Sequence, residues 1–374
     1  MKICHVTSAH PEEDGRIFRR GCVSAAQNGY ETYLVQRGKT YDKDGVHIIG
    51  IGIPRKNGRI YRMTSFAREA YYAARELNCD LYHLHDPELL PYARKLHRAG
   101  KAVVFDSHEN YVEQIRNKTY LPSLIARTLS MLYDKYSKKV FQEIDGLTYP
   151  GNDSQESVYH GLCKRVVSTD NLPWLSEFYE KYNEEVQREP RTACYIGGLN
   201  KARGITQIIK ACSMAGCKLY LAGEFESEEY KKTLEEMKEY SCVEYLGMIG
   251  REAVFELLSK VSLGICLLLE VGQYYKMQNL PTKVYEYMSM SLPVLLNDSL
   301  YNKKINKELK LGYCVDPMDV EKCSKAIRDM LDNPKLCKEF GENGRAAIRN
   351  RFCWDIEQEK LITLYKDILS EKGC

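Results

Sequence analysis

The sequence has no uninterrupted apolar stretch of about 18 residues, and this absence excludes a membrane-spanning helix. Its first residues lack the charged start, apolar core and small-residue cleavage site of a signal peptide. None of its 14 cysteines belongs to a Cys-x-x-Cys pair, and most lie in apolar segments, which indicates buried thiols in a reducing compartment rather than disulfides or zinc ligands. We therefore expect a cytoplasmic protein.

The glycine pattern GxGxxG of dinucleotide-binding proteins is also absent, which argues against a dehydrogenase. What is present is 374 residues, 44% hydrophobic and 28% charged, and this balance is typical of a globular protein rather than a disordered one. At roughly 150 residues per domain, this length predicts about two domains.

Short runs of apolar and β-branched residues alternate with longer helical patterns, which is typical of parallel βαβ units. The predicted strands are 2–7, 31–36, 46–51, 81–83, 102–105 and 147–149, followed by 193–197, 218–222, 243–246, 263–268, 293–296 and 312–315. A polar connector at 181–191 separates the two series. We predict an α/β protein with two doubly wound Rossmann-like domains facing a cleft, at 1–180 and 192–352.

Polar residues gather just after the predicted strands, where open parallel sheets bind their ligands. In the first half these residues are His10, Asp14, Arg16, His85, Asp86, Asp106, His108 and Glu109. In the second half they include Gly197, Gly198, Lys201, Arg203, Gly223 and Gly247. The sequence therefore predicts substrate-binding residues in both domains.

One motif is the glycine-rich turn of residues 195–204, which links a strand to a helix. Glycines let a backbone approach a ligand, and Arg203 can donate two hydrogen bonds to a phosphate near a helix N-terminus. A plain strand-turn-helix connection explains the same glycines equally well.

A second motif covers residues 278–294. Pro281 suits the first position of a helix, and Thr282 and Lys283 then lie in a first turn that attracts anions. Glu286 follows one turn later. A carboxylate near bound phosphates needs neutral donors such as ribose hydroxyls; the alternative is a surface glutamate on an amphipathic helix.

The order and spacing of these motifs resemble the GT-B fold nucleotide-sugar glycosyltransferases of the retaining family 4 type, the glycosyl transferases group 1. The matching segments are 81–86, 104–109, 197–204, 219–223, 243–247, 281–293 and the tail at 352–368. The resemblance implies a C-terminal helix at 353–374 that returns to the first domain. It also implies transfer of a sugar, with retention, from a UDP- or GDP-linked donor to a saccharide or lipid-linked acceptor in cell-surface polysaccharide synthesis, without a metal or other cofactor.

In such an enzyme the second domain binds the donor. The resemblance assigns the diphosphate to Arg203 and the ribose to Glu286. The full set of expected donor-binding residues is Gly197, Gly198, Arg203, Gly223, Met248, Ile249, Gln278, Leu280, Thr282, Lys283 and Glu286.

Two positions depart from the family pattern. Gly198 stands where the family commonly has an arginine, and we expect Lys283 to supply the missing cation. Gln278 stands where the family often has a glutamate, so the usual contact with the donor sugar loses its charge.

In the first domain, the resemblance places His108 near the reacting carbon, and with Arg203 and Glu286 it completes the expected catalytic set. The alternative for His108 is a hydrogen bond to its own strand end. Acceptor contacts are expected from His10, Asp14, Arg16, His85, Asp86 and Glu109. The spacing of His83, His85 and Asp86 is compatible with a metal site, but the resemblance favours none.

Charge is unevenly distributed, with a net +8 in residues 1–140 and −5 in the remainder. Apolar residues recur at helical spacing in the segment 121–139, beside Arg127, Lys135, Lys138 and Lys139; they are Leu121, Ile125, Leu129, Leu132 and Tyr136. This helix either lies on an anionic membrane at the inner face of the cell or packs its apolar stripe on its own domain. No nucleic-acid-binding module is recognised. The rival functions are a GT-B nucleotide-sugar epimerase and a non-catalytic assembly subunit.

Overall fold

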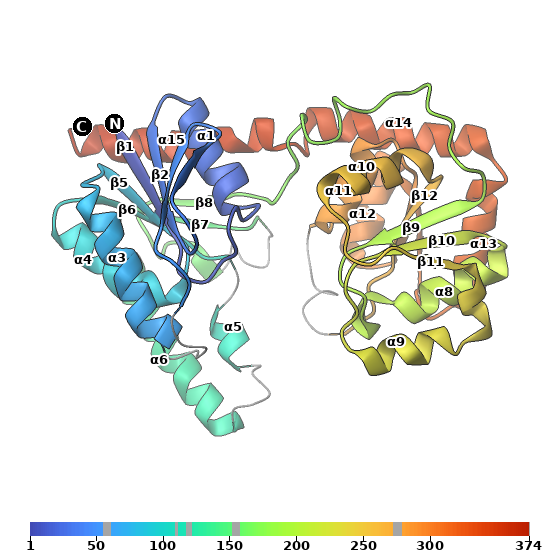
Figure 1. The fold of residues 1–374 in the computed structure, drawn as a ribbon, viewed down its shortest axis with the longest axis horizontal. Helices are drawn as coiled ribbons and strands as arrows, with labels where there is room; N and C mark the ends of the chain where they lie inside the picture. The colour runs from blue at the N-terminus through green and yellow to red at the C-terminus, as the bar shows by residue number, and fades with distance from the viewer. Residues whose placement is uncertain (55–60, 109–110, 117–121, 152–157, 272–278, 374) are drawn as a thin grey trace. The chain divides into compact units, whose positions relative to one another are not determined.

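The computed structural model describes residues 1–54, 61–108, 111–116, 122–151, 158–271 and 279–373 (Figure 1). The chain divides into two compact units, Met1–Asn171 with Glu357–Cys374, and Leu172–Ile356. The division precedes the polar connector expected at 181–191. The reason is that Leu172 and Phe178 are buried in the core of the second unit, so the segment before the connector already packs there.

The first unit has an eight-stranded sheet in the part of the chain described, with strand order β3-β4-β2-β1-β5-β6-β7-β8. Neighbouring strands are parallel except β3 and β4, which are antiparallel. The strands are β1 (Lys2–Val6), β2 (Glu31–Gln36), β3 (Tyr41–Lys43), β4 (Val46–Gly50), β5 (Leu81–Leu84), β6 (Ala102–Asp106), β7 (Gly146–Tyr149) and β8 (Val166–Ser168). The helices are η1 (Ile17–Cys22), α1 (Val23–Gln27), η2 (Arg62–Phe66), α3 (Ala67–Glu76), η3 (Pro87–Leu89), α4 (Leu90–Arg98), α5 (Tyr111–Arg116), α6 (Ser123–Phe141) and most of α15 (Trp354–Glu371).

Helix α15 brings the end of the chain back to the first unit, as the resemblance implies. It packs closely on β7, because a Cβ atom at Gly146 would lie 3.0 Å from Ile368 and 3.3 Å from Leu364. Tyr365 on the same helix is fully buried. Figure 1 shows this helix running along the sheet of the first unit.

The second unit, within the residues described, has a parallel sheet in the order β11-β10-β9-β12-β13-β14. The strands are β9 (Thr192–Ile196), β10 (Lys218–Ala222), β11 (Val243–Tyr245), β12 (Leu263–Cys266), β13 (Val294–Asn297) and β14 (Gly312–Val315). The helices are η4 (Lys201–Arg203), α8 (Ile205–Ala215), α9 (Glu228–Glu235), η5 (Lys238–Cys242), α10 (Arg251–Lys260), α11 (Thr282–Ser289), α12 (Leu300–Leu309), α13 (Val320–Leu331) and α14 (Pro334–Asn350). Both faces of the sheet are covered, since Cys194 joins one core cluster while its neighbours Ala193 and Tyr195 join another.

Helix α6 turns its apolar stripe to the surface, so the expectation that the stripe packs on its own domain is wrong. Leu124, Leu132 and Ile125 are 75%, 61% and 50% exposed. The buried face consists instead of small residues and the helix end, namely Ala126, Ser130, Ser137, Val140 and Phe141. Leu121 lies outside the described residues. None of the helices described is long and apolar enough to cross a membrane.

Candidate active site

Strands β1, β5 and β6 of the first unit end at one edge of the sheet, and polar side chains meet there. His85 follows β5, Asp106 is the last residue of β6, and His108 comes two residues later. The Nδ1 atom of His85 lies 3.2 Å from Asp106 Oδ2 and 3.3 Å from His108 Nε2. The structure thus brings together His85 and His108 as the sequence predicted, around a buried carboxylate.

Asp106 receives hydrogen bonds on both carboxylate oxygens. Arg16 donates from Nε to Oδ2 across 2.8 Å and from Nη2 to Oδ1 across 2.7 Å, and Thr148 donates to Oδ1 across 2.8 Å. Burial raises the pKa of Asp106, but the charge of Arg16 and the neighbouring His108 outweigh it and hold the pKa well below its usual value. Arg16 therefore stabilises an anion inside the protein and is buried there.

His108 faces this anion through one ring nitrogen, since Nε2 lies 3.2 Å from Asp106 Oδ2. The same Nε2 atom lies 3.3 Å from His85 Nδ1, so the position of the proton depends on the tautomers of both rings. Burial lowers the pKa of His108 to about 3, despite the opposing charge of Asp106. The imidazole is consequently neutral at physiological pH, with one ring nitrogen that donates a hydrogen bond and one that accepts.

Asp86 has a structural role that its place after a strand did not reveal. It accepts hydrogen bonds from the Thr7 hydroxyl and from the backbone of Ser8 and Ala9, and it lies 2.8 Å from His10 Nδ1. Burial lowers the pKa of His10, but the bond to Asp86 outweighs it, so the pKa is raised overall. The His10 ring in turn stacks on His108, with 4.5 Å between ring centroids.

Asp14 lies near this network, and its charge helps to raise the pKa of His10 and of Arg16. Its Oδ1 accepts from the backbone N–H groups of Arg16 and Ile17, just before η1. Glu109 lies outside the described residues.

A second group of side chains lies behind His85; sequence reasoning singled out His83 but missed its neighbours His5 and Tyr365. His5 on β1 donates or accepts through Nδ1 to His85 Nε2 at 3.0 Å, and His83 contacts the Tyr365 hydroxyl at 2.6 Å and Thr148 at 3.2 Å. Only the register of the parallel strands, in which His5 pairs with His83, brings these rings together.

The sets His5, His83, His85 and His85, Asp106, His108 are each close enough to share a metal ion. Two of these contacts, His5 with His85 and His85 with Asp106, join members of the same set, whereas both ring nitrogens of His83 contact residues outside it, Tyr365 and Thr148. The residues form one hydrogen-bonded network.

In the second unit, two cations border the glycine turn after β9. A Cβ atom at Gly197 would lie 3.0 Å from Lys283 Nζ and 3.4 Å from Arg203 Nη1, and the φ angle of Gly197 is +127°. Lys283 is buried and donates to the Tyr195 hydroxyl across 2.8 Å. The neighbouring turn is equally tight, because a Cβ at Gly223 would lie 2.0 Å from the Gly197 carbonyl oxygen. Only glycine suits these positions.

Helix α11 starts at Thr282, so Pro281 precedes the helix as its cap rather than occupying the first helical position. Its backbone ψ of 144° is extended, which explains the difference. Leu280 is buried and Met248 is largely exposed. Gly198 and Ile249 lie beside the turns after β9 and β11, and Gln278 lies outside the described residues.

Glu286 is only 7% exposed, which overturns the alternative of a surface glutamate. Its Oε1 accepts a hydrogen bond from Arg251 Nη1 across 2.6 Å. Arg251 also binds Glu177. No local sequence pattern predicts this pairing.

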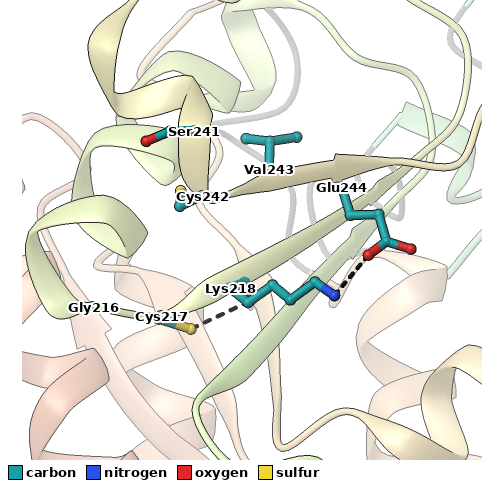
Figure 2. A pocket seen from close by; sticks show the side chains of 7 residues that line it. All are labelled: Gly216, Cys217, Lys218, Ser241, Cys242, Val243 and Glu244. Atoms are coloured by element: carbon teal, nitrogen blue, oxygen red, sulfur yellow. Dashed lines mark hydrogen bonds and ion pairs between the residues drawn. The ribbon is translucent and has the colours of Figure 1, made fainter.

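A surface pocket of about 420 Å³ lies at the opposite edge of the same sheet (Figure 2). It is lined by the starts of β10 and β11, including Cys217, Lys218 and Glu244. The Lys218 ammonium and the Glu244 carboxylate form an ion pair at 2.6 Å. Because Gly197 and Gly223 follow the other ends of their strands, this pocket contains none of the expected donor-binding residues.

Comparisons with known proteins agree with this arrangement. Residues 22–168 match the model of Glycosyltransferase Family 4, and residues 179–347 match that of Glycosyl transferases group 1. The chain is 21% identical over 342 residues to the Bacillus subtilis (strain 168) protein called "Putative glycosyltransferase EpsD", with 85% of this chain and 84% of that protein covered.

Two solved structures share the fold. A sucrose-phosphate synthase from Thermosynechococcus elongatus has a TM-score of 0.74 at 14% identity and covers 99% of this chain and 100% of its own. WaaG, a glycosyltransferase involved in lipopolysaccharide biosynthesis, has a TM-score of 0.68 at 14% identity and covers 96% of this chain and 98% of its own. With a family model matching each unit, the chain belongs to the group 1 glycosyltransferases of the GT-B fold.

Proposed function

We propose that this enzyme transfers a sugar from a UDP- or GDP-linked donor to a saccharide or lipid-linked acceptor, with retention, in cell-surface polysaccharide synthesis. The motif resemblance to the retaining family 4 type supports retention. The shared fold with a glycosyltransferase involved in lipopolysaccharide biosynthesis supports the cell-surface role. We place the reaction in the cytoplasm, peripherally at the inner face of the cell membrane.

The observation that carries the donor assignment is the convergence of Lys283 and Arg203 on Gly197. A tight glycine turn lets a diphosphate approach the backbone, and α11 adds the partial positive charge of its N-terminus. Two cations at this point stabilise the charge that develops on the departing nucleoside diphosphate. Lys283 thereby supplies the cation that Gly198 cannot.

His108 contributes as a neutral hydrogen-bonding group. Its Nε2 faces Asp106 and His85, so its Nδ1 is the atom that forms a hydrogen bond with a sugar hydroxyl. A pKa of about 3 excludes His108 as a proton donor at neutral pH. In a front-face transfer the departing diphosphate takes the acceptor proton, so no protein base is required.

The test is mass spectrometry of the purified protein with UDP- and GDP-sugars, with and without saccharide acceptors. A transferase releases free nucleotide only when acceptor is present, and a Glu286→Ala variant abolishes the release. Glu308→Ala, which removes an exposed glutamate paired with Arg351, serves as the control and keeps full activity. Isomerisation of the donor without nucleotide release would instead establish an epimerase, and absence of any turnover would favour an assembly subunit.

The exposed face of α6 supports the membrane location. It combines Leu124, Ile125, Leu129 and Leu132 with four cationic side chains, and the helix carries a single acidic residue, Asp134. In Figure 1 the N-terminus of α6 lies farther from the sheet of the first unit than its C-terminus does. Apolar residues inserted among anionic headgroups, with cations beside them, are typical of an interfacial helix.

A further inference from the structure

Arg251, at the start of α10, joins two carboxylates of the second unit. Its Nη1 donates to Glu286 Oε1 across 2.6 Å, and its Nη2 donates to Glu177. Its guanidinium carbon also lies 4.4 Å from the centroid of the Phe178 ring, which is itself buried. Two segments distant in the sequence, one with Glu177 and Phe178 and one with Glu286, therefore hold this guanidinium in one place.

This pairing resolves an electrostatic difficulty in the donor site. Glu286 lies one helical turn after Lys283 on α11, so its carboxylate is close to the position assigned to the diphosphate. A buried carboxylate without a partner is costly, and it repels a phosphate group. Arg251, the first residue of α10, provides a positive charge that compensates the negative charge of Glu286.

The pairing with Arg251 also makes the two oxygens of the Glu286 carboxylate different from each other. Oε1 is bound to Arg251, and the described part of the chain records no hydrogen bond to Oε2. A fixed carboxylate with one oxygen available has the geometry to accept hydrogen bonds from a neutral diol.

We propose that Arg251 is a positioning residue of the donor site, which fixes Glu286 so that its second oxygen accepts hydrogen bonds from the ribose hydroxyls of a nucleoside diphosphate. This inference rests on the proposed function, because it takes the second unit as the donor site. Arg251 acts through Glu286 and does not touch the ribose. This positioning should make the site selective for ribonucleotides, because a polar site that binds hydroxyl groups rejects a ligand that lacks them.

The experiment measures binding of UDP, GDP and their 2′,3′-dideoxy forms to the full chain by isothermal titration calorimetry. We expect the wild-type protein to bind one ribonucleotide at least about tenfold more tightly than its dideoxy form. Arg251→Met should weaken binding of that ribonucleotide by about tenfold and leave the dideoxy form within about twofold of wild type. Arg251→Lys keeps the charge but not the planar fork, so it should restore part of the discrimination.

A matched control exists in the same unit. Arg351 likewise pairs with a glutamate, Glu308, at 2.9 Å, and its guanidinium carbon lies 4.8 Å from the Phe352 ring centroid. Arg351→Met should leave binding of all four nucleotides unchanged. Glu177→Gln weakens the anchoring of Arg251. It should therefore reduce the preference for the ribonucleotide over its dideoxy form, by a smaller factor than Arg251→Met does.

Three results would overturn the role of Arg251. If Arg251→Met weakens binding of the ribonucleotide and of its dideoxy form equally, the variant has general structural damage. Unchanged binding would mean that Glu286 needs no positioning. Tighter binding would mean that Arg251 competes with the ligand. If the wild-type protein discriminates and Arg251→Met does so equally, only this inference fails. If the wild-type protein binds neither UDP nor GDP, the donor assignment fails and the inference fails with it.

Discussion

The Nε2 atom of His108 lies 3.2 Å from Oδ2 of Asp106, a carboxylate that also receives two hydrogen bonds from Arg16. This contact turns the Nε2 atom of the imidazole toward the protein. Burial nevertheless keeps the ring neutral, because it lowers the pKa of His108 to about 3 against the opposing charge of Asp106. The residue expected near the reacting carbon is therefore suited to orient a substrate rather than to transfer a proton.

The pKa values of the neighbouring residues His10 and His108 should depart from the ordinary histidine value in opposite directions. NMR of histidine ring protons from pH 4 to 8 should show His108 neutral throughout and His10 titrating above its ordinary value of 6.5. The stabilisation from the His10–Asp86 pair is accordingly complete below pH 6.5 and is lost as the pH rises through the raised pKa. The stabilisation of the folded state by neutral His108 is complete above pH 6.5 and is lost as the pH falls toward about 3.

Assignment of these resonances comes from His10→Asn and His108→Gln variants. Asp86→Asn should return the pKa of His10 toward or below its ordinary value, because the partner that raises it is gone. A His108 resonance that titrates near pH 6.5 would contradict the lowered pKa of this residue.

Replacing Lys283 should weaken donor binding. Lys283→Ala removes a buried cation beside Gly197, and we expect the Michaelis constant for the donor to rise by about 10- to 100-fold, since hydrogen bonds to charged groups contribute about 1.5–3 kcal/mol. Lys283→Arg should recover part of the loss. Steady-state kinetics check this, with Lys322→Ala, an exposed lysine on α13, as the control. Unchanged kinetics in Lys283→Ala would refute the substitution of Lys283 for the missing arginine.

Removing the Tyr365 hydroxyl should loosen the C-terminal helix locally. Tyr365→Phe leaves His83 Nδ1 buried without its partner at 2.6 Å. A buried polar atom left unpaired costs about 1–3 kcal/mol, so amide hydrogens of α15 and β5 should exchange faster. Hydrogen-exchange mass spectrometry measures this, and Tyr72→Phe, whose side chain is half exposed on α3, should change nothing. Unaltered exchange in α15 would show that the hydroxyl is dispensable.

Binding to anionic vesicles should depend on the exposed start of α6. The wild-type protein should sediment with phosphatidylglycerol vesicles and much less with phosphatidylcholine vesicles. The double variant Leu124→Glu, Leu132→Glu should bind at least about tenfold more weakly, because burying each leucine contributes about 1.5–3 kcal/mol. Leu300→Glu changes an 88% exposed leucine of α12 and should bind as wild type. Equal binding by all three proteins would exclude α6 as the membrane contact.

Sequence patterns were sufficient for the main strands and for the glycine turn, while the roles of the site residues stay predictions. Every predicted strand is found, and most contain a run of buried apolar residues, although β11 and β14 are mostly half-buried. The missed strands β3 and β8 have three residues each and lie at the edges of their sheet, where no face-specific pattern develops. The glycine turn and Lys283 were identifiable from local chemistry alone.

Contacts between distant segments could not be predicted in this way. Arg251 and Glu286 are 35 residues apart, and Tyr365 and His83 are 282 apart, so neither pair leaves a local pattern. Asp86 was expected to contact the acceptor because it follows a strand, but whether such a carboxylate faces a ligand or its own backbone depends on the neighbouring loop. The burial of Leu172 and Phe178 likewise places a mostly polar segment in the second unit.

Helix α15 has a consequence for the order in which the protein is made. The second unit, Leu172–Ile356, is continuous in the chain and can complete its packing as soon as it leaves the ribosome. The first unit is translated earlier, yet β7 at Gly146 and the buried His83 acquire their α15 contacts only when the last residues emerge. The unit synthesised first is therefore the one whose native packing is completed last, and during translation the face that α15 covers is exposed.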